Sequence, residues 1–303
     1  MAKSKSRAKL WIAGARVRTL PLAVAPIIVA SGAASALQAF NPLLTALALV
    51  VSLSLQIGVN YANDYSDGVR GTDDHRVGPM RLTGSKQVPA KKVKHAAFIF
   101  FGVAAAAGLA IVAISGLWWL LAVGAVAIIA AWYYTGGKRP YGYAGLGELV
   151  VFIFFGPVAV CGTILVQFPA ITKIPEVWLW VAPAAIGLGL YAAAVLMINN
   201  IRDIETDKLS GKNTLAVRLG KTAAKGIYFA MIWLPLAINY TFILFKMNGA
   251  FFMPLLLVFL LIPLTLIVST AKTPPEQITA LKLTSLAAII FAVLVGFGMW
   301  RIF

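Results

Sequence analysis

The stretch LLTALALVVSLSLQIGVNYANDYSDGVRGTDD, residues 43–74, joins a long apolar run to a segment that contains four aspartates. A carboxylate beside hydrocarbon is costly to desolvate, so it either lies where the chain leaves the membrane or binds a partner that offsets this cost. The apolar run is long enough to cross a bilayer as a helix, which takes roughly 17 to 25 residues. The stretch therefore predicts a transmembrane helix with an acidic end.

The composition extends this prediction to the whole chain. Of its 303 residues, 60% are hydrophobic and 12% are charged, which is typical of an integral membrane protein. The sequence predicts an all-α membrane protein with nine transmembrane helices, at residues 20–40, 43–61, 95–115, 117–134, 146–168, 177–198, 224–245, 251–268 and 283–300. We expect a single domain, residues 1–303, whose functional site is carried by two long polar connections at 64–94 and 201–223.

The basic residues predict the orientation of these helices. If residues 1–19 and every second connection lie on one side, all but three of the 26 Lys and Arg residues fall on that side. Such an excess marks the cytoplasmic side, so we expect a multi-pass protein of the plasma membrane with a cytoplasmic N-terminus. Orientation and contact with membrane lipid account for the net charge of +16, and we predict no binding of nucleic acid.

Seven of the ten acidic residues fall on the same side, and orientation does not explain them. At the end of the second helix, polar side chains recur every three or four residues, at Gln56, Asn60, Asn63 or Asp64, and Asp67. The sixth helix ends with the same spacing, at Asn199, Asp203 and Asp207. Residues at this spacing share one face of a helix, so each set predicts a polar stripe.

Such stripes predict a metal and phosphate site. Carboxylate and carboxamide oxygens suit Mg²⁺, which is usually shared with substrate phosphates. Basic side chains that could bind phosphate follow or flank both stripes, at Arg70, Arg76, Arg81, Lys86, Arg202, Lys208, Lys212 and Arg218. The alternative is that each stripe is a solvated helix end with local ion pairs. Two matching stripes on one side of a membrane protein favour the metal site.

The two motifs resemble those of the UbiA superfamily of intramembrane prenyltransferases, whose members have nine transmembrane helices. Asn63 and Asp67 match the first two positions of the family pattern N-x-x-x-D-x-x-x-D, while the third aspartate falls at Asp73 after two extra residues. Asp203 and Asp207 match the second pattern, D-x-x-x-D. The segment YTGGKR, residues 134–139, is similar to a family segment whose lysine and arginine meet the diphosphate.

Within the superfamily, the chain most resembles the 1,4-dihydroxy-2-naphthoate polyprenyltransferases of menaquinone synthesis. The likeness lies in ARVRTLPLAVAPIIVASG at 15–32, NYANDYSDGVRGTDDHRVGPMRL at 60–82, GLGELVVFIFFGPVAVCGT at 145–163 and NNIRDIETD at 199–207. It implies Mg²⁺-dependent transfer of a polyprenyl group from polyprenyl diphosphate to 1,4-dihydroxy-2-naphthoate, with loss of carbon dioxide, to give demethylmenaquinone. The acceptor carboxylate would meet Arg18, Arg81 or Lys138.

The motifs and the resemblance together give a set of expected site residues. The expected metal ligands are Asp67, Asp73, Asp203, Asp207, Asn63 and Asp64. Catalytic roles are expected for Asp67, Asp203, Asp207, Lys138 and Glu148, where Glu148 either places substrate and helps to deprotonate a hydroxyl or is an interfacial residue paired with a base. Substrate binding is expected at Asn60, Asn63, Asp64, Arg70, Arg76, Arg81, Lys138, Arg139, Asn199, Arg202, Lys212 and Arg18.

Other functions fit the sequence less well. A prenyltransferase acting on hydroxybenzoate or homogentisate is the nearest alternative. A CDP-alcohol phosphotransferase would carry D-x-x-D-G-x-x-A-R, but Gly71 and Thr72 occupy the last two positions of that pattern. A transporter should place charges near the bilayer midplane, whereas here they collect at one boundary.

Overall fold

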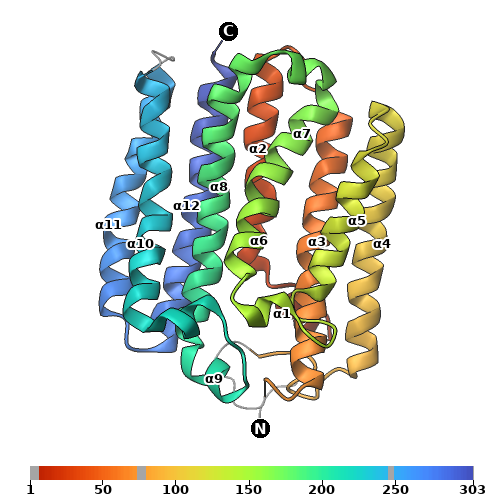
Figure 1. Ribbon diagram of the computed structural model, residues 1–303, viewed down its shortest axis with the longest axis vertical. Coiled ribbons are helices and arrows are strands. Elements are labelled where there is room, and N and C mark those ends of the chain that lie inside the picture. Colours follow the sequence, from red (N-terminus) through yellow and green to blue (C-terminus); the bar gives the residue numbers. More distant parts are fainter. Residues whose placement is uncertain (1–6, 74–79, 245–248, 303) are drawn as a thin grey trace.

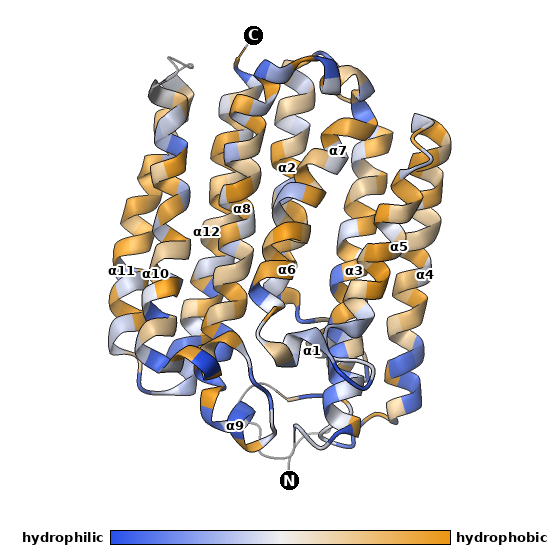
Figure 2. Cartoon of the chain, in the orientation of Figure 1, coloured by the Kyte–Doolittle hydropathy of each residue, from blue (hydrophilic) through white to orange (hydrophobic). Residues whose placement is uncertain are grey.

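The computed structural model describes residues 7–73, 80–244 and 249–302, and the regular structure of these residues is helical. Long helices stand side by side in an upright bundle, with the short helices α1 (Arg7–Ala15) and α9 (Ile204–Leu209) at its lower end (Figure 1). Hydrophilic residues gather at this lower end, around α9 and the adjoining connections, whereas the helices above are largely hydrophobic (Figure 2). The bundle therefore has one strongly polar end.

Each of the nine predicted apolar runs is helical over most of its described length. The helices that cover them are α2 (Pro21–Ala36), α3 (Pro42–Val69), α4 (Ala90–Ser115), α5 (Leu120–Tyr133), α6 (Gly147–Ile153) with α7 (Ala159–Gln167), α8 (Pro175–Arg202), α10 (Leu215–Leu244), α11 (Val258–Thr270) and α12 (Pro274–Trp300). In the described part of the chain, six helices are long and apolar enough to span a membrane, or seven if the bent pair Arg7–Thr19 and Pro21–Ala36 is one span. The chain is therefore a multi-pass membrane protein.

Local sequence signals set several helix ends. The side chain of Asn41 accepts a hydrogen bond from the backbone N–H of Leu44 and caps α3, with Pro42 at the first helical position. Thr273 and Glu276 form a capping box at the start of α12. Gly116 ends α4 in the left-handed conformation, which glycine adopts without steric cost.

The described bundle has three clusters of buried apolar side chains, of which the smallest joins α2, α3, α4 and α7. The larger core joins α2, α7, α8, α10, α11 and α12, and a smaller core joins α1, α3 and α4. In Figure 1, α6, α7 and α2 lie between α8 and α3. Close backbone contact fixes the segment between α6 and α7 against α8, because a Cβ on Gly156 would lie 2.4 Å from the Ala185 carbonyl oxygen.

A π-helical turn, η3 (Phe154–Val158), interrupts the span between α6 and α7 and contains Pro157. Proline has no N–H to donate, and a π turn is a common local adjustment inside an α-helix. The apolar sequence predicted one continuous helix here. The interruption matters for the site because Phe154, Phe155 and Val158 all line the cavity described next.

Candidate active site

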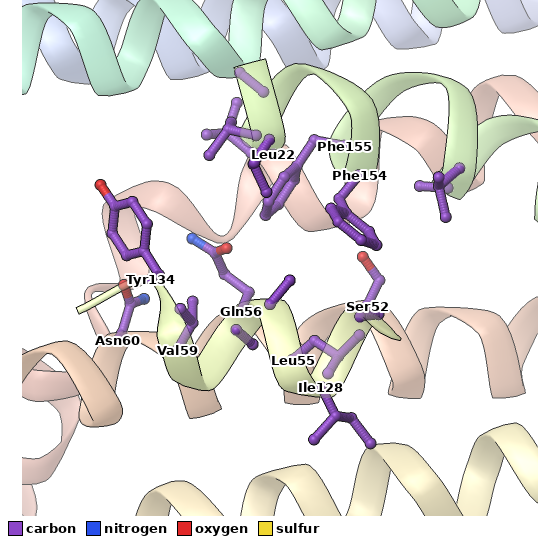
Figure 3. A pocket seen from close by; sticks show the side chains of 18 of the residues that line it. Leu22, Ser52, Leu55, Gln56, Val59, Asn60, Ile128, Tyr134, Phe154 and Phe155 are labelled. Carbon is purple, nitrogen blue, oxygen red and sulfur yellow. The ribbon is translucent and has the colours of Figure 1, made fainter. Parts of the chain in front are cut away.

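A cavity of about 580 Å³ is lined by residues of α2, α3, α4, α5 and α8, among other elements, and extends from the polar end of the bundle into its apolar interior. Figure 3 shows Phe154 and Phe155 on one wall, facing Ser52, Leu55 and Gln56 of α3. The charged and polar lining includes Arg16, Arg18, Asn60, Asn63, Asp67, Arg81, Tyr143, Asn199, Asn200, Asp203, Asp207 and Lys212. The cavity therefore joins a charged compartment to a hydrocarbon-like one.

The apolar part of the cavity reaches the outside of the bundle at α4 and α5. Leu109 of α4 and Leu121 of α5 line the cavity and are about half exposed, at 51% and 44%. Small residues such as Ala105, Gly108 and Gly124 line the same part and leave room between the two helices. A long apolar ligand can therefore extend from the cavity to the lipid-facing surface.

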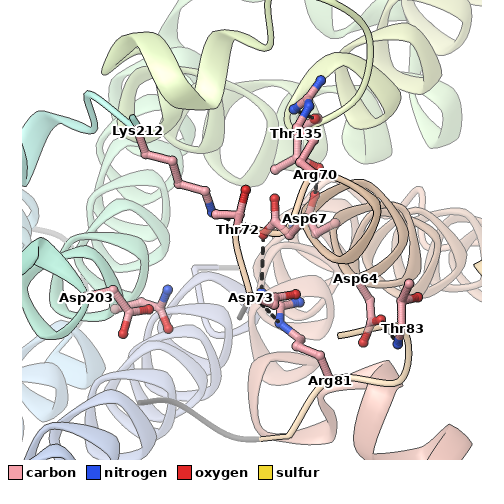
Figure 4. A network of polar contacts seen from close by, with 12 residues as sticks. Asp64, Asp67, Arg70, Thr72, Asp73, Arg81, Thr83, Thr135, Asp203 and Lys212 are labelled. Atoms are coloured by element: carbon pink, nitrogen blue, oxygen red, sulfur yellow. Dashed lines mark hydrogen bonds and ion pairs between the residues drawn. The ribbon is translucent and has the colours of Figure 1, made fainter. Parts of the chain in front are cut away.

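Asp67 lies at the centre of the charged compartment (Figure 4). Its Oδ2 is 3.1 Å from Nζ of Lys212 and 3.7 Å from Nη2 of Arg81, and its Oδ1 accepts a hydrogen bond of 2.8 Å from the Tyr143 hydroxyl. The Asp67 side chain is almost fully buried. Two cations from different connections thus stabilise one carboxylate, which is how a buried charge avoids a large desolvation cost.

Tyr143 belongs to a short 3-10 helix, η2 (Tyr141–Ala144), which lies between α5 and α6. Burial, and then the negative charge of Asp67, raise the pKa of the Tyr143 phenol. The phenol therefore keeps its proton and donates a hydrogen bond to Asp67. The Lys212 ammonium lies 4.8 Å from the centre of the Tyr143 ring, a cation–π contact that adds to the cluster.

The second aspartate motif reaches the same cavity from α8 and α9. Asp203 is the C-cap of α8, and Asp207 lies in the short helix that follows. Both are buried and line the cavity, and Asp207 Oδ1 is 4.0 Å from Lys212 Nζ. Lys212 therefore connects the two motifs electrostatically, as the sequence predicted for two stripes that share one site.

Arg202 holds Asp203 in a two-pronged ion pair. Its Nε and Nη2 donate to the two Asp203 oxygens at 2.7 and 2.6 Å, and Nη2 also donates to Oδ1 of Asn199 at 2.8 Å. Asn199 lines the cavity, whereas Arg202 is not part of its lining. In this structure Arg202 orients the second motif rather than reaching toward a ligand.

Asp64 has a different place from the one expected of a metal ligand. Its Oδ2 and Oδ1 accept hydrogen bonds from the backbone N–H groups of Leu82 and Thr83, both at 2.8 Å. It does not line the main cavity. Asp64 instead fixes the connection that carries Arg81, because both of its oxygens are used by that connection. Asp73 also lies outside the cavity lining, with Oδ1 3.8 Å from Arg81 Nε.

Arg70, Lys138 and Arg139 are not brought into the cavity. Arg70 donates to the carbonyl oxygens of Thr135 and Gly137, so it holds the turn after α5. Lys138 and Arg139 follow that turn and are exposed, and none of the three lines the cavity. The structure therefore places the two side chains outside the cavity lining, and their expected contact with the diphosphate stays a prediction. Arg76 lies outside the described residues.

The remaining amides of the first stripe contact other parts of the site. Asn60 donates to the carbonyl oxygen of Ala15 at 3.0 Å, and Asn63 accepts a 2.8 Å hydrogen bond from the Thr135 hydroxyl. Both line the cavity. The stripe therefore has two roles: Asn60 anchors the N-terminal segment through Ala15, and Asp67 carries the negative charge.

That N-terminal segment brings two arginines to the cavity wall. Arg16 has a left-handed backbone conformation with φ of 54° and starts the short 3-10 helix η1 (Val17–Thr19). Such a conformation is uncommon for residues other than glycine. Arg16 and Arg18 line the cavity, as Arg81 does. Of the three residues expected to meet the acceptor, Arg18 and Arg81 line the cavity and Lys138 does not, while Arg16 lines it without having been predicted.

Glu148 meets the site only through a neighbour. It is buried at the start of α6, and its Oε1 accepts a 2.9 Å hydrogen bond from Nδ2 of Asn200. Asn200 lines the cavity and Glu148 does not. Asn200 and Tyr143 were both missed by the sequence reasoning. The doubled asparagine beside the second stripe was the available signal for Asn200, and nothing in the sequence pattern marked Tyr143.

The donor set fits a magnesium ion that is shared with a ligand. Among the described residues, no group of three or more His, Cys, Asp or Glu side chains could hold a metal ion by itself. Mg²⁺ usually takes only one or two protein carboxylates, with water and substrate phosphate completing its shell. Asp67, Asp203 and Asp207 bring such carboxylates to one compartment from three elements.

Comparison with known proteins agrees with this geometry. The model of the UbiA prenyltransferase family matches residues 23–289. The chain is 50% identical over 223 residues to a protein from Mycobacterium tuberculosis named 1,4-dihydroxy-2-naphthoate octaprenyltransferase, covering 73% of this chain and 74% of that one. It is 40% identical over 250 residues to a protein of the same name from Escherichia coli, covering 80% and 79%.

Solved structures share the fold at low sequence identity. A UbiA homolog from Aeropyrum pernix K1 superposes with a TM-score of 0.66 at 15% identity, covering 91% of this chain and 96% of that one. A UbiA homolog from Archaeoglobus fulgidus, described as bound to DMAPP and Mg²⁺, superposes with a TM-score of 0.64 at 16% identity, covering 97% and 100%. At this identity the likeness concerns the fold alone.

Proposed function

The chain belongs to the UbiA prenyltransferase family, and we propose that it transfers a polyprenyl group from a polyprenyl diphosphate to 1,4-dihydroxy-2-naphthoate with loss of carbon dioxide. The product is demethylmenaquinone in its reduced, quinol form. The relatives that carry the octaprenyltransferase name at 40% to 50% identity support the acceptor. The observation that carries the proposal is the cavity, which joins the carboxylates of both aspartate motifs to an apolar compartment.

The membrane placement is part of the proposal. We infer nine spans in one domain, residues 1–303, with α5 and α10 crossing beside the helices that are long and apolar enough to span. Most basic residues belong to the end of the bundle that carries the site, so the positive-inside rule supports a cytoplasmic N-terminus and a cytoplasmic active site. The plasma membrane is the corresponding location for a bacterial-type quinone pathway enzyme.

At the charged end, the chain's own residues would bind the diphosphate head. Asp67, Asp203 and Asp207 would hold Mg²⁺, which neutralises charge on the diphosphate and so favours its departure from the allylic carbon. Lys212 lies next to both motifs and would offer its ammonium to the same head group. Arg202 would keep Asp203 oriented throughout. In this arrangement the carboxylates would bind the metal ion, and the ammonium of Lys212 would bind the phosphate oxygens.

The acceptor would lie against the arginines of the other wall. Its carboxylate fits Arg16, Arg18 and Arg81, which approach the cavity from the N-terminal segment and the connection after α3. In the reaction the allylic carbon leaves the diphosphate oxygen and bonds to a ring carbon. The ring carbon loses its carboxylate as carbon dioxide, and the electron pair of that bond returns to the ring. Atoms and charge balance without another reactant.

The apolar compartment would hold the prenyl chain and exclude water. An allylic cation reacts with water if it meets any, so a site lined by Leu55, Ile128, Phe154 and Phe155 protects it until the ring attacks. The outlet at α4 and α5 would let the rest of a long chain lie in the bilayer. A transporter is disfavoured because the charged residues of the cavity collect at one end of it.

An acceptor panel tests the proposal. Protein purified into lipid nanodiscs is supplied with Mg²⁺ and a polyprenyl diphosphate, and prenylated product is measured with 1,4-dihydroxy-2-naphthoate, 4-hydroxybenzoate or homogentisate. We expect turnover with the naphthoate and little with the two benzene acceptors. Turnover with 4-hydroxybenzoate alone would contradict the proposed acceptor but would still agree with prenyl transfer. No turnover with any acceptor would contradict the whole proposal.

A further inference from the structure

The roles proposed above do not use the contact between Asn200 and Glu148. Asn200 projects from α8 beside the cavity and is 7% exposed, and Glu148 lies behind it on α6 and is 3% exposed. Their 2.9 Å hydrogen bond runs from Nδ2 of Asn200 to Oε1 of Glu148. A buried carboxylate is costly unless it is paired or hydrogen-bonded, and Asn200 supplies a hydrogen bond to Glu148 here. The pair therefore calls for a function beyond packing.

Glu148 fixes the direction in which the Asn200 carboxamide points. Nδ2 of Asn200 donates to Oε1 of Glu148, so the NH₂ end of the amide faces Glu148 and the carbonyl end faces away from it. In the part of the chain that the structure describes, this is the only hydrogen bond of the Asn200 side chain. The carbonyl oxygen Oδ1 is therefore left at the cavity wall as an acceptor. The bond to a carboxylate also polarises the amide and makes that oxygen a stronger acceptor.

An acceptor oxygen at this wall needs a donor on the ligand. On the proposed function, on which this inference rests, the ring brings one carboxylate and two hydroxyl groups. The hydroxyl next to the carboxylate bonds to that carboxylate within the molecule. The other hydroxyl, across the same ring, is free to donate. With the carboxylate at the arginine wall, the free hydroxyl can reach a different wall of the cavity.

We propose that Asn200 Oδ1 accepts a hydrogen bond from the acceptor hydroxyl that is remote from the carboxylate. Asn200 is then a specificity-determining residue, and Glu148 is a positioning residue that acts through it. A site built to bind a hydroxyl rejects an analogue that lacks it, because the buried protein group is left without a partner. The pair therefore selects a ring that carries a hydroxyl at this position.

Three stable ligands test this contact in the full-length protein in nanodiscs with Mg²⁺. They are 4-hydroxy-2-naphthoate, 2-naphthoate without the hydroxyl, and 4-methoxy-2-naphthoate without the donor, and their Kd values are measured by calorimetry. The wild-type protein should bind the hydroxy ligand about 5- to 150-fold more tightly than the other two, the range that an unpaired buried group gives. This comparison needs no variant, so it stands even if a variant fails to fold.

Variants then assign the contact to the pair. In Asn200→Leu the preference for the hydroxy ligand should disappear, and the KM for the naphthoate should rise while the KM for the prenyl diphosphate stays unchanged. Glu148→Gln should keep much of the preference, since a glutamine oxygen can accept the same N–H. Asn239→Leu is the matched control, because Asn239 is a buried asparagine that bonds to the Phe251 carbonyl oxygen away from the cavity. It should keep the preference in full.

Each other outcome overturns the inference. If the wild-type protein binds the hydroxy and methoxy ligands equally but still prenylates dihydroxynaphthoate, the hydroxyl contact is wrong and the proposed function survives. If the preference persists in Asn200→Leu, another residue accepts the hydroxyl. If the wild-type protein neither binds these ligands nor prenylates dihydroxynaphthoate, both the inference and the proposed function are wrong.

Discussion

Replacing Asp67 by asparagine should affect stability and turnover through different contacts. The substitution removes one negative charge from a carboxylate that lies 3.1 Å from Lys212 Nζ and 3.7 Å from Arg81 Nη2. Breaking a buried ion pair by removing one partner destabilises a protein by about 3 to 5 kcal/mol. In the variant, Arg81 still has its ion pair with Asp73, and Lys212 still has its longer one with Asp207. We therefore expect the free energy of unfolding to fall by about 3 kcal/mol, the lower end of that range.

The effect on turnover has a separate origin. Asparagine can still accept the hydrogen bond of the Tyr143 hydroxyl, but it has no charge to offer a metal ion. Removing one electrostatic group that acts in the transition state lowers kcat roughly 100- to 1,000-fold. The Asp67→Asn variant should therefore lose at least that much activity, even under conditions in which most of the protein is folded.

A second substitution separates the two effects. Adding Lys212→Met removes the cation that Asp67→Asn leaves without its closest partner, so the double variant should recover most of the lost free energy of unfolding. It should not recover turnover. Unfolding is followed by tryptophan fluorescence in denaturant, and product is measured chromatographically in nanodiscs. Undiminished turnover in Asp67→Asn, or a double variant no more stable than the single one, would refute this reasoning.

Three further predictions concern residues around this centre. Asp64→Ala should destabilise the protein by about 2 to 4 kcal/mol, because two buried hydrogen bonds to a charged group are lost, and limited proteolysis should then cleave near Leu82 sooner than in the wild type. Lys138→Ala should keep most of the wild-type kcat in steady-state assays, since its side chain is exposed outside the cavity. Tyr143→Phe should lower turnover about 3- to 10-fold, because the Asp67 carboxylate loses the hydrogen bond that holds its orientation. Because burial raises its pKa, the wild-type phenol stays protonated, so both proteins should share one pH–rate profile up to about pH 10.

The sequence predicted the helices well because hydrophobic length is a strong local signal. The structure also brings Asp67, Asp203 and Asp207 to one cavity, as their helical spacing and the family resemblance indicated. The number of spans is less directly readable. In the described chain six or seven helices are long and apolar enough, and α5 has only 14 residues.

The placements that the sequence did not indicate concern residue types that allow more than one partner. Asp64 and Asp67 belong to the same acidic end, but one carboxylate turns to backbone N–H groups of a connection and the other to the cavity. Lys138 follows a turn that Arg70 holds through backbone carbonyls, and no sequence pattern encodes that contact. Asn199 and Asn200 are the same residue type at adjacent positions of α8, but they point to different partners. Asn199 accepts a hydrogen bond from Arg202, whereas Asn200 donates one to Glu148.

In the proposed reaction, this chain joins a polyprenyl group to 1,4-dihydroxy-2-naphthoate as the carboxylate departs. The most direct measurement uses acceptor labelled with ¹⁴C in the carboxylate, together with polyprenyl diphosphate, Mg²⁺ and the protein in nanodiscs. We predict that labelled carbon dioxide and diphosphate are released in equal amounts, and that the lipid product carries no label. A prenylated product that keeps the label, or diphosphate release without carbon dioxide, would contradict the account.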